Sequence, residues 1–417
     1  MPDINTGDTA FVLIASAMVL LMTPGLAFFY GGMVRRKNVL NTMMSSYGII
    51  GVAAAMWIAV GYTLSFGPDV GGVIGNLSWA GLMGVGRTPN AAYAATIPHL
   101  LFAVFQMMFA IITPAIITGA VAERMKYSAQ LLFTVLWSLV VYYPLAHMVW
   151  GTGGFLRNMG ALDFAGGNVV HISSGVSGLI ACLVLGKRKK AGSSTPAPHN
   201  IPFVLLGAGI LWFGWFGFNA GSALSANDVA VTAFLNTMTS GAFGMLSWML
   251  MESFTNKKPT ALGAATGAVV GLASVTQAAG YIPVWGAVVT GLVVSPLCWA
   301  AVTMLKRKLR YDDSLDAFGC HGIGGIWGSI VTGLFASSAV NPAVTKEGLV
   351  FSGNFGLMGP TLAAMGVTVA LAVGGTFVIM KLVGVITKMR VTSREENEGL
   401  DHSQHGESAY PSFTGLD

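Results

Sequence analysis

Two histidines in uncharged, glycine-rich runs are the residues of this sequence best suited to chemistry. His171 lies in GNVVHISSGVSGLIACLV (167–184), which contains no charged residue. His321 stands in the same pattern, a histidine followed by glycine at the fourth and seventh positions, and an aspartate (Asp163 or Asp313) precedes each histidine by eight residues. The repetition of both features predicts two matched elements that each carry one imidazole.

A pair of buried imidazoles is suited to hydrogen bonding with a small polar molecule. Desolvation disfavours the imidazolium, so we expect neutral rings, each with one donor and one acceptor. A bare metal cation would prefer carboxylates or a ring of carbonyls. Three interpretations remain open: each histidine bonds a neighbouring helix, the pair lines a pathway, or the two rings are axial ligands of haem in an electron-transfer protein.

The composition places these histidines in a membrane protein. The chain has 417 residues, of which 54% are hydrophobic and 9% charged, whereas soluble domains have about 25% charged residues. Backbone groups in lipid must be satisfied internally, which favours helices, and the alternation typical of a β-barrel is absent. The three cysteines form no CxxC pair and there is no catalytic triad or P-loop. We expect no enzyme activity, no metal, no cofactor and no nucleic-acid partner.

Apolar runs of about 20 residues mark transmembrane helices. The sequence predicts an all-α polytopic fold with eleven spans. Their expected bounds are 9–33, 41–66, 98–122, 127–149, 167–186, 201–222, 231–254, 260–279, 282–305, 317–338 and 358–388.

The loops between these spans are alternately basic and nearly free of basic residues. One side carries 19 of the 22 Lys and Arg residues, and the other has only Arg87, Arg157 and Lys346. Because basic loops stay in the cytoplasm, we expect the N-terminus outside and the C-terminus inside. An odd number of spans agrees with this orientation.

The matched histidine patterns lie in spans five and ten, five spans apart. An odd separation reverses the direction of crossing, so spans 1–5 and 6–10 are predicted to form an inverted repeat, with span eleven added. Such repeats place a substrate site near the membrane midplane between the halves. Glycine rows allow close approach of helix backbones, and packing of spans five and ten would bring the histidines together.

Long motifs in the expected order resemble the ammonium transporter (Amt) family, which is related to the Mep and Rhesus proteins. They are TPGLAFFYGGMVRRKNVLN (23–41), FQMMFAIITPAIITGAVAER (105–124), YPLAHMVWG (143–151), GALDFAGGNVVHISSG (160–175), WFGWFGFNAGSA (212–223), DAFGCHGIGGIWG (316–328) and GLDHSQHGESAY (399–410). The resemblance implies a homotrimer in the cell membrane, with one pore per subunit for ammonium or ammonia and with methylammonium as an analogue.

Roles carry over to individual positions from this resemblance. Trp150, Phe109 and Ser222 match the outer recruitment site, and Phe109 with Phe218 matches a stacked gate below it. His171 and His321 match the twin histidines of the lumen, Trp215 a residue of the pore wall, and Asp163 the acidic residue behind the recruitment site. The resemblance implies that ammonium is deprotonated there and that Asp163 stays ionised; whether net charge crosses is left open.

Plainer interpretations exist for several of these residues. Trp150 also fits an interfacial aromatic belt, and Phe109 and Phe218 fit ordinary packing. Asp163 fits a cap of span five, and Asp313 and Asp316 fit a cap of span ten or partners of the basic loop 306–310. Gln277 departs from the family pattern, in which proline is frequent, and this leaves the end of span eight open.

The polar C-terminal segment is expected to lie in the cytoplasm. We assign residues 1–390 to the transmembrane domain and 391–417 to this tail. His402 and His405 lack the further ligands of a metal site. The resemblance implies that the tail packs on the inner face of the trimer and that a PII-type signalling protein binds there. A receptor that binds ammonium without moving it remains an alternative, weakened by a tail too short for an output domain.

Overall fold

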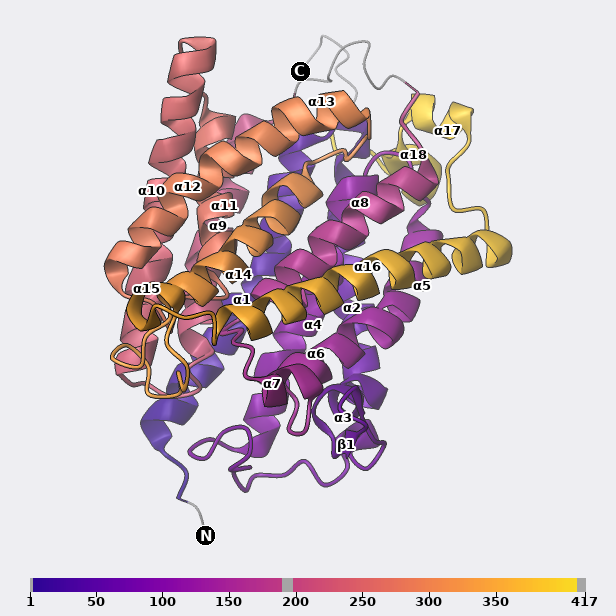
Figure 1. The fold of residues 1–417 in the computed structure, drawn as a ribbon. Helices are drawn as coiled ribbons and strands as arrows, with labels where there is room; N and C mark the ends of the chain where they lie inside the picture. Colours follow the sequence, from indigo (N-terminus) through magenta and orange to yellow (C-terminus); the bar gives the residue numbers. More distant parts are fainter. Residues whose placement is uncertain (1–2, 190–197, 411–417) are drawn as a thin grey trace.

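A computed structural model describes residues 3–189 and 198–410 of the chain as a bundle of long helices (Figure 1). Within these residues, ten helical segments are long and apolar enough to cross a membrane, and an eleventh apolar helix, Ala261–Val275, has 15 residues. The prediction of an eleven-span, all-α membrane protein is confirmed. The chain is a multi-pass membrane protein.

The first five spans lie close to their predicted bounds. Three of them contain π-helical turns, which often mark functional positions in helices. The elements are α1 (Thr6–Met33), η1 (Arg36–Asn38), α2 (Val39–Met56), η2 (Trp57–Gly61), α3 (Tyr62–Phe66), α4 (His99–Val121), α5 (Tyr127–Trp137), η4 (Ser138–Tyr142), α6 (Tyr143–Trp150), η5 (Gly167–Ile172) and α8 (Ser173–Leu185).

The remaining spans also agree with the prediction, with one exception. The elements are α9 (Ile201–Gly221), α10 (Asp228–Asn256), α11 (Ala261–Val275), α12 (Val284–Ala300), η6 (Ala301–Leu305), α13 (Lys306–Leu309), η7 (Phe318–Gly322), α14 (Ile323–Phe335) and α16 (Met358–Ile386). The end of span eight, left open because of Gln277, lies at Val275 instead of the expected residue 279, and the chain continues in successive turns to Tyr281. Apolar residues alone do not reveal this end, since the turns are buried as deeply as the helix.

Short elements outside the spans were not predicted. Between α3 and α4 the chain forms a two-stranded antiparallel ladder, β1 (Asp69–Val70) with β2 (Ile74–Gly75), and then η3 (Ala80–Leu82). Two more short helices flank the outer loops, α7 (Phe155–Met159) and α15 (Leu349–Ser352), and the tail forms α17 (Ser393–Glu398) and α18 (Leu400–His405). The start of α1 and the tail helices lie at opposite ends of the bundle (Figure 1), as an odd number of spans requires.

The two halves of the chain pack as the inverted repeat predicts. The first span of each half, α1 and α9, lie against each other, and α8 packs on η7 while α14 packs on η5. The glycine four residues after each histidine makes this contact. A Cβ atom on Gly175 would collide with the backbone of Gly322, and a Cβ on Gly325 would lie 3.0 Å from the backbone nitrogen of Ile172. The glycine pattern therefore sets the distance between the two histidine-bearing helices.

This close approach predicts a large cost for a side chain at Gly175. The Gly175→Ala variant forces the two helices apart, and we expect a loss of about 1–3 kcal/mol of stability, the usual cost of overpacking. Thermal unfolding of purified protein in detergent measures the effect. Gly366→Ala in α16 is the matched control, because a Cβ there meets no atom within 4 Å. Equal melting temperatures for the two variants would show that the helices do not depend on this contact.

Span ten begins with the aspartate predicted to cap it. The Asp313 carboxylate accepts hydrogen bonds from the backbone N–H groups of Ala317 and Phe318 at 3.1 and 2.8 Å. Asp316 instead pairs with Lys306, with a nitrogen–oxygen distance of 2.6 Å. Capping and pairing with the basic loop, the two roles expected for these aspartates, are therefore both confirmed.

Two arginines of the basic loops at the tail end of the bundle pair with buried carboxylates. Arg188 pairs with Glu123 and with Asp312, both at 2.7 Å, and Arg35 also pairs with Glu123 at 2.9 Å. Lys190, the last residue of the predicted basic cluster 187–190, lies outside the described residues. Burial raises the pKa of Glu123, but the two arginines outweigh it and lower this pKa to about 2. Burial also raises the pKa of Asp312, but its hydrogen bonds and charge interaction with Arg188 outweigh this effect and lower the pKa to about 2.

Removing Arg188 is expected to destabilise the folded protein strongly. Arg188→Met leaves two buried carboxylates without their shared cation, at a cost of about 3–5 kcal/mol near pH 7. Because both folded pKa values lie below those of the unfolded chain, the stabilisation is present above about pH 4.5 and fades as the pH falls towards 2. Melting curves at pH 7 and pH 3 should show a variant defect that shrinks in acid. Arg307→Met, at an exposed position, is the control, and a defect of the same size at both pH values would contradict the ion-pair origin.

The tail is tied to the same end of the bundle. Its backbone N–H at Leu400 donates to the Asn38 side chain, and the Asp401 carboxylate accepts from the backbone N–H of Asn41, both at 2.9 Å. Arg390 pairs with Glu396 at 2.9 Å. Packing of the tail on the bundle, implied by the resemblance, thus holds within one subunit for residues up to 410. The assigned tail residues 411–417 lie outside the described residues.

Candidate functional site

A wide vestibule opens at the end of the bundle away from the tail. The cavity measures about 560 Å³, and its lining includes Trp150 from the end of α6, Phe109 from α4, Ser222 at the end of α9, and Asp163. The three residues predicted for recruitment therefore share one cavity. The Ser222 hydroxyl donates to the backbone oxygen of Phe218 at 2.8 Å, which leaves its lone pairs available to accept an N–H group.

Two phenylalanine rings close the floor of the vestibule. The centroids of Phe109 and Phe218 lie 4.2 Å apart with an angle of 35° between the rings. The Trp150 ring meets Phe109 edge to face at 6.1 Å. Both phenylalanines are buried, with 1% of their surface exposed. Neither ring faces lipid, because both are buried and face each other inside the protein.

Asp163 forms the cap at the start of span five. Its two carboxylate oxygens accept four backbone N–H groups, from Gly166, Gly167, Asn168 and Val169, at 2.7–3.2 Å. Burial raises the pKa of Asp163 to about 6 despite these bonds, so the carboxylate is mostly ionised at pH 7. The Trp150 indole N–H donates to the backbone oxygen of Asp163 at 2.9 Å. Asp163 therefore caps η5 and also lines the cavity that holds Trp150, Phe109 and Ser222.

The two predicted histidines meet directly behind the phenylalanine pair. Their Nδ1 atoms lie 3.1 Å apart, and the rings are 15° from parallel with centroids 5.2 Å apart. His171 stacks on Trp215 at 5.6 Å and lies 6.1 Å from Phe218. Each histidine sits in a π-helical turn, η5 or η7, that follows a capping aspartate. The structure thus brings the two matched patterns into a single site.

The hydrogen bond between the rings fixes what the pair offers. The Nδ1–H of one ring donates the hydrogen bond and the unprotonated Nδ1 of the other accepts it. The first ring therefore has an acceptor at Nε2, and the second has a donor there. The Nε2 of His171 has no protein partner. The pair therefore presents one donor and one acceptor to a neutral molecule that can do both.

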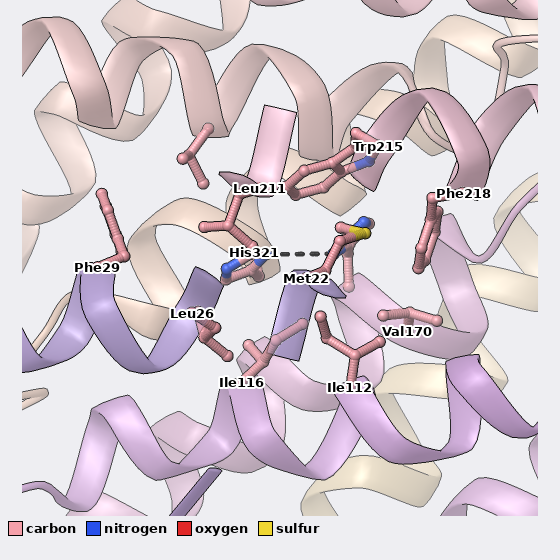
Figure 2. Close-up of a pocket in the computed structure, with 12 residues that line it drawn as sticks. Met22, Leu26, Phe29, Ile112, Ile116, Val170, Leu211, Trp215, Phe218 and His321 are labelled. Carbon is pink, nitrogen blue, oxygen red and sulfur yellow. Dashed lines mark hydrogen bonds between the residues drawn. The ribbon is translucent and has the colours of Figure 1, made fainter. Parts of the chain in front are cut away.

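A narrow apolar lumen surrounds the pair. Its volume is about 10 Å³, roughly the room for a single water-sized molecule. In Figure 2, Phe218 and Phe29 lie at the two ends of the row, with the hydrogen-bonded histidines between them. The other lining residues are Met22, Leu26, Ile112, Ile116, Val170, Leu211, Trp215 and Val269. The haem interpretation is wrong, because a ring pair in direct hydrogen bond and a lumen of this size leave no space for a macrocycle.

Residues that shape the lumen escaped the sequence interpretation where they have no reactive group. Met22, Leu26 and Phe29 of α1 and Ile112 and Ile116 of α4 were indistinguishable from core or lipid-facing residues. Met22 with Leu26, and Ile112 with Ile116, have the i, i+4 spacing of residues on one helix face, and this spacing is the only signal that the sequence offered. Thr276, which accepts the indole N–H of Trp215 at 2.9 Å, was also missed, because a lone threonine at the end of a span has many uses.

Comparison with known proteins agrees with these observations. The family model described as Ammonium Transporter Family matches residues 10–410. The ammonium transporter of Bacillus subtilis is 52% identical over 404 residues, covering 97% of this chain and 98% of the relative.

Solved structures show the same fold. The crystal structure of Saccharomyces cerevisiae Mep2 aligns with a TM-score of 0.89 at 35% identity, covering 99% of this chain and 93% of that one. A structure titled "Sensor Amt Protein" aligns with a TM-score of 0.88 at 27% identity, covering 96% and 98%. Sequence and fold agree across nearly the whole length of each protein. This chain belongs to the ammonium transporter family.

Proposed function

We propose that this protein carries ammonium or ammonia across a cell membrane through a pore within each subunit. The observation that supports it most is the order of the site: an open vestibule, a stacked ring pair, and then a narrow apolar lumen that holds two hydrogen-bonded imidazoles. A single small polar molecule fits this sequence of environments. The family and the relatives named as ammonium transporters support the same substrate.

Recruitment would take place in the vestibule. Aromatic faces attract a cation, with energies of about 0.5–2 kcal/mol, and Trp150 and Phe109 supply two such rings. Ser222 would accept one N–H of the ion. The ionised Asp163 lies in the wall of the same cavity, so its charge would favour a cation over a neutral molecule or an anion.

Entry into the lumen would require loss of the proton. A charge at the bilayer centre costs at least about 2.5–3.5 kcal/mol, and the lumen contains no carboxylate among its lining residues. The proton would leave to water in the open vestibule, and the ammonia that passes behind Phe109 and Phe218 would avoid this cost. The free Nε2 atoms of His171 and His321 would then accept from and donate to the molecule in turn. Whether the proton crosses by another route decides whether transport is electrogenic.

The assembly and its surroundings follow from the same proposal. The N-terminus would face the outside and the tail the cytoplasm, which puts the vestibule outside and the Arg188 network inside. The chain would form a homotrimer in the cell membrane, with residues 1–390 in the transmembrane domain and 391–417 in the tail. A PII-type signalling protein would bind the cytoplasmic face. The protein would act without a catalytic step.

Uptake of radiolabelled methylammonium into proteoliposomes tests the transport function. We expect saturable uptake that unlabelled ammonium abolishes and that a tenfold excess of potassium leaves in place. Protein-free liposomes are the control. Binding of ammonium without uptake above this control would overturn the proposal.

A sensory function is the second candidate. It is favoured by the similarity to the structure titled "Sensor Amt Protein" and by the tail docked beside the basic loops. In that case ammonium binding would change the position of the tail without transport. The same proteoliposomes, combined with a fluorophore on the tail, separate the two functions.

A further inference from the structure

The turn that follows α11 contacts the segment that leads to His171 and the helix that follows His321 through one side chain. Gln277 is fully buried there, with none of its surface exposed. Gln277 lines neither the lumen nor the vestibule. A buried amide in that position requires a reason, because burial of a side-chain amide without hydrogen-bond partners is unfavourable.

We infer that Gln277 is a positioning residue that holds the His171 turn in register with the helix that follows His321. Its Nε2 donates to the backbone oxygen of Leu162 at 3.0 Å, and its Oε1 accepts from the Ser329 hydroxyl of α14 at 2.6 Å. The inference rests on the proposed function, since it assigns a residue that sets the geometry of that conduction site.

Two further contacts extend the bridge on the His171 side. The backbone oxygen of Gln277 accepts from the N–H of Phe164 at 3.0 Å. The first residue of η5, Gly167, packs on the amide itself, so closely that a Cβ there would overlap it. The segment from Leu162 to Gly167, which includes Asp163, is therefore held at both ends and at Phe164 by one residue. Four residues after Gly167 comes His171.

The residue before Gln277, Thr276, contacts the ring that stacks on His171. Thr276 accepts the indole N–H of Trp215, and Trp215 stacks on His171. Gln277 thus contacts the segment before His171 and the helix after His321, and Thr276 contacts the ring that stacks on His171.

The Gln277→Met variant tests the inference, because methionine keeps the volume but neither donates to Leu162 nor accepts from Ser329. Gln130→Met is the matched control: Gln130 is also a buried glutamine that accepts from a serine, Ser45, at 2.8 Å, and it lies away from the lumen. Both variants lose one buried glutamine and should lose similar stability. Only Gln277→Met should alter the site.

The first measurement is geometric and does not depend on transport. In a cryo-EM structure of Gln277→Met, we expect the Nδ1–Nδ1 distance of the histidines to exceed 3.5 Å, with the distance kept at about 3.1 Å in Gln130→Met. An unchanged distance in Gln277→Met would overturn the inference. This result stands whether or not the protein proves to be a transporter.

The second measurement is the ratio of ammonium to methylammonium flux in proteoliposomes. A change in lumen geometry should shift this ratio at least threefold in Gln277→Met, whereas loss of folded protein lowers both fluxes equally and leaves the ratio constant. Ser329→Ala removes one end of the bridge and should shift the ratio in the same direction. A constant ratio in a transporting Gln277→Met protein would also overturn the inference. Absence of flux in the unsubstituted protein would instead count against the proposed function.

Discussion

Substitution of either lumen histidine by alanine should lower ammonium flux by at least tenfold and reduce the preference for ammonium over potassium. Each ring satisfies the other through the 3.1 Å Nδ1–Nδ1 contact. Removal of one ring leaves a buried donor or acceptor without a partner, which costs about 1–3 kcal/mol. It also opens space beside Trp215 and Phe218 that water or a hydrated cation can enter.

The two substitutions should not be additive. If the rings act as a unit, the double variant His171→Ala/His321→Ala should be little worse than either single variant, with a coupling energy of about 0.5–3 kcal/mol. Proteoliposomes with labelled methylammonium and a potassium-sensitive dye give both flux and selectivity. The control is His147→Ala, since His147 is a buried histidine that pairs with Asp69 at 2.8 Å and lines no part of the lumen. Wild-type flux and selectivity in both single lumen variants would refute the role of the pair.

Substitution of Asp163 by asparagine should weaken recruitment of the cation. The carboxylate lies in the wall of the vestibule, and unit charges in contact near a protein surface attract by up to about 4 kcal/mol, so we expect a rise in apparent KM of roughly tenfold or more. The variant also replaces one acceptor oxygen by an amide that faces the backbone N–H groups of η5. We therefore expect a loss of stability of about 1–3 kcal/mol in addition.

The charge on Asp163 also predicts a pH dependence of uptake. Its pKa of about 6 means that the carboxylate protonates as the solution on the vestibule side becomes more acidic than pH 6. Uptake at constant ammonium concentration should then fall between pH 7.5 and pH 5, and this fall should be absent in Asp163→Asn. The folded pKa lies above the ordinary value of 3.8, so the contribution of this group to stability is greatest below about pH 4 and declines as the pH rises through 6.

A matched variant separates recruitment from folding. Asp313→Asn removes the equivalent cap from η7 but lies outside the vestibule. It should lower the melting temperature to a similar extent and leave KM within twofold of the unsubstituted value. An equal rise of KM in both variants would mean that Asp163 acts only as a helix cap.

The sequence by itself determined the membrane class, the number of spans and the pairing of the two halves. Charge depletion and run length suffice for the spans because the bilayer imposes one length and one composition on every crossing segment. The inverted repeat was readable for a related reason. Asp163 with His171 and Asp313 with His321 are local patterns, and each aspartate caps the turn that carries its histidine a few residues later.

Only the tertiary structure decided how the halves meet and which apolar residues face the lumen. Leu26 and Ile116 have the composition of core residues, and what makes them lumen residues is the position of other helices around them. Gln277 shows the same limit: its partners, Leu162 and Ser329, are 115 and 52 residues away. A hydrogen bond between such distant residues leaves no periodic trace in the sequence, since it depends on how a turn, a loop and a helix pack together and not on any one of them.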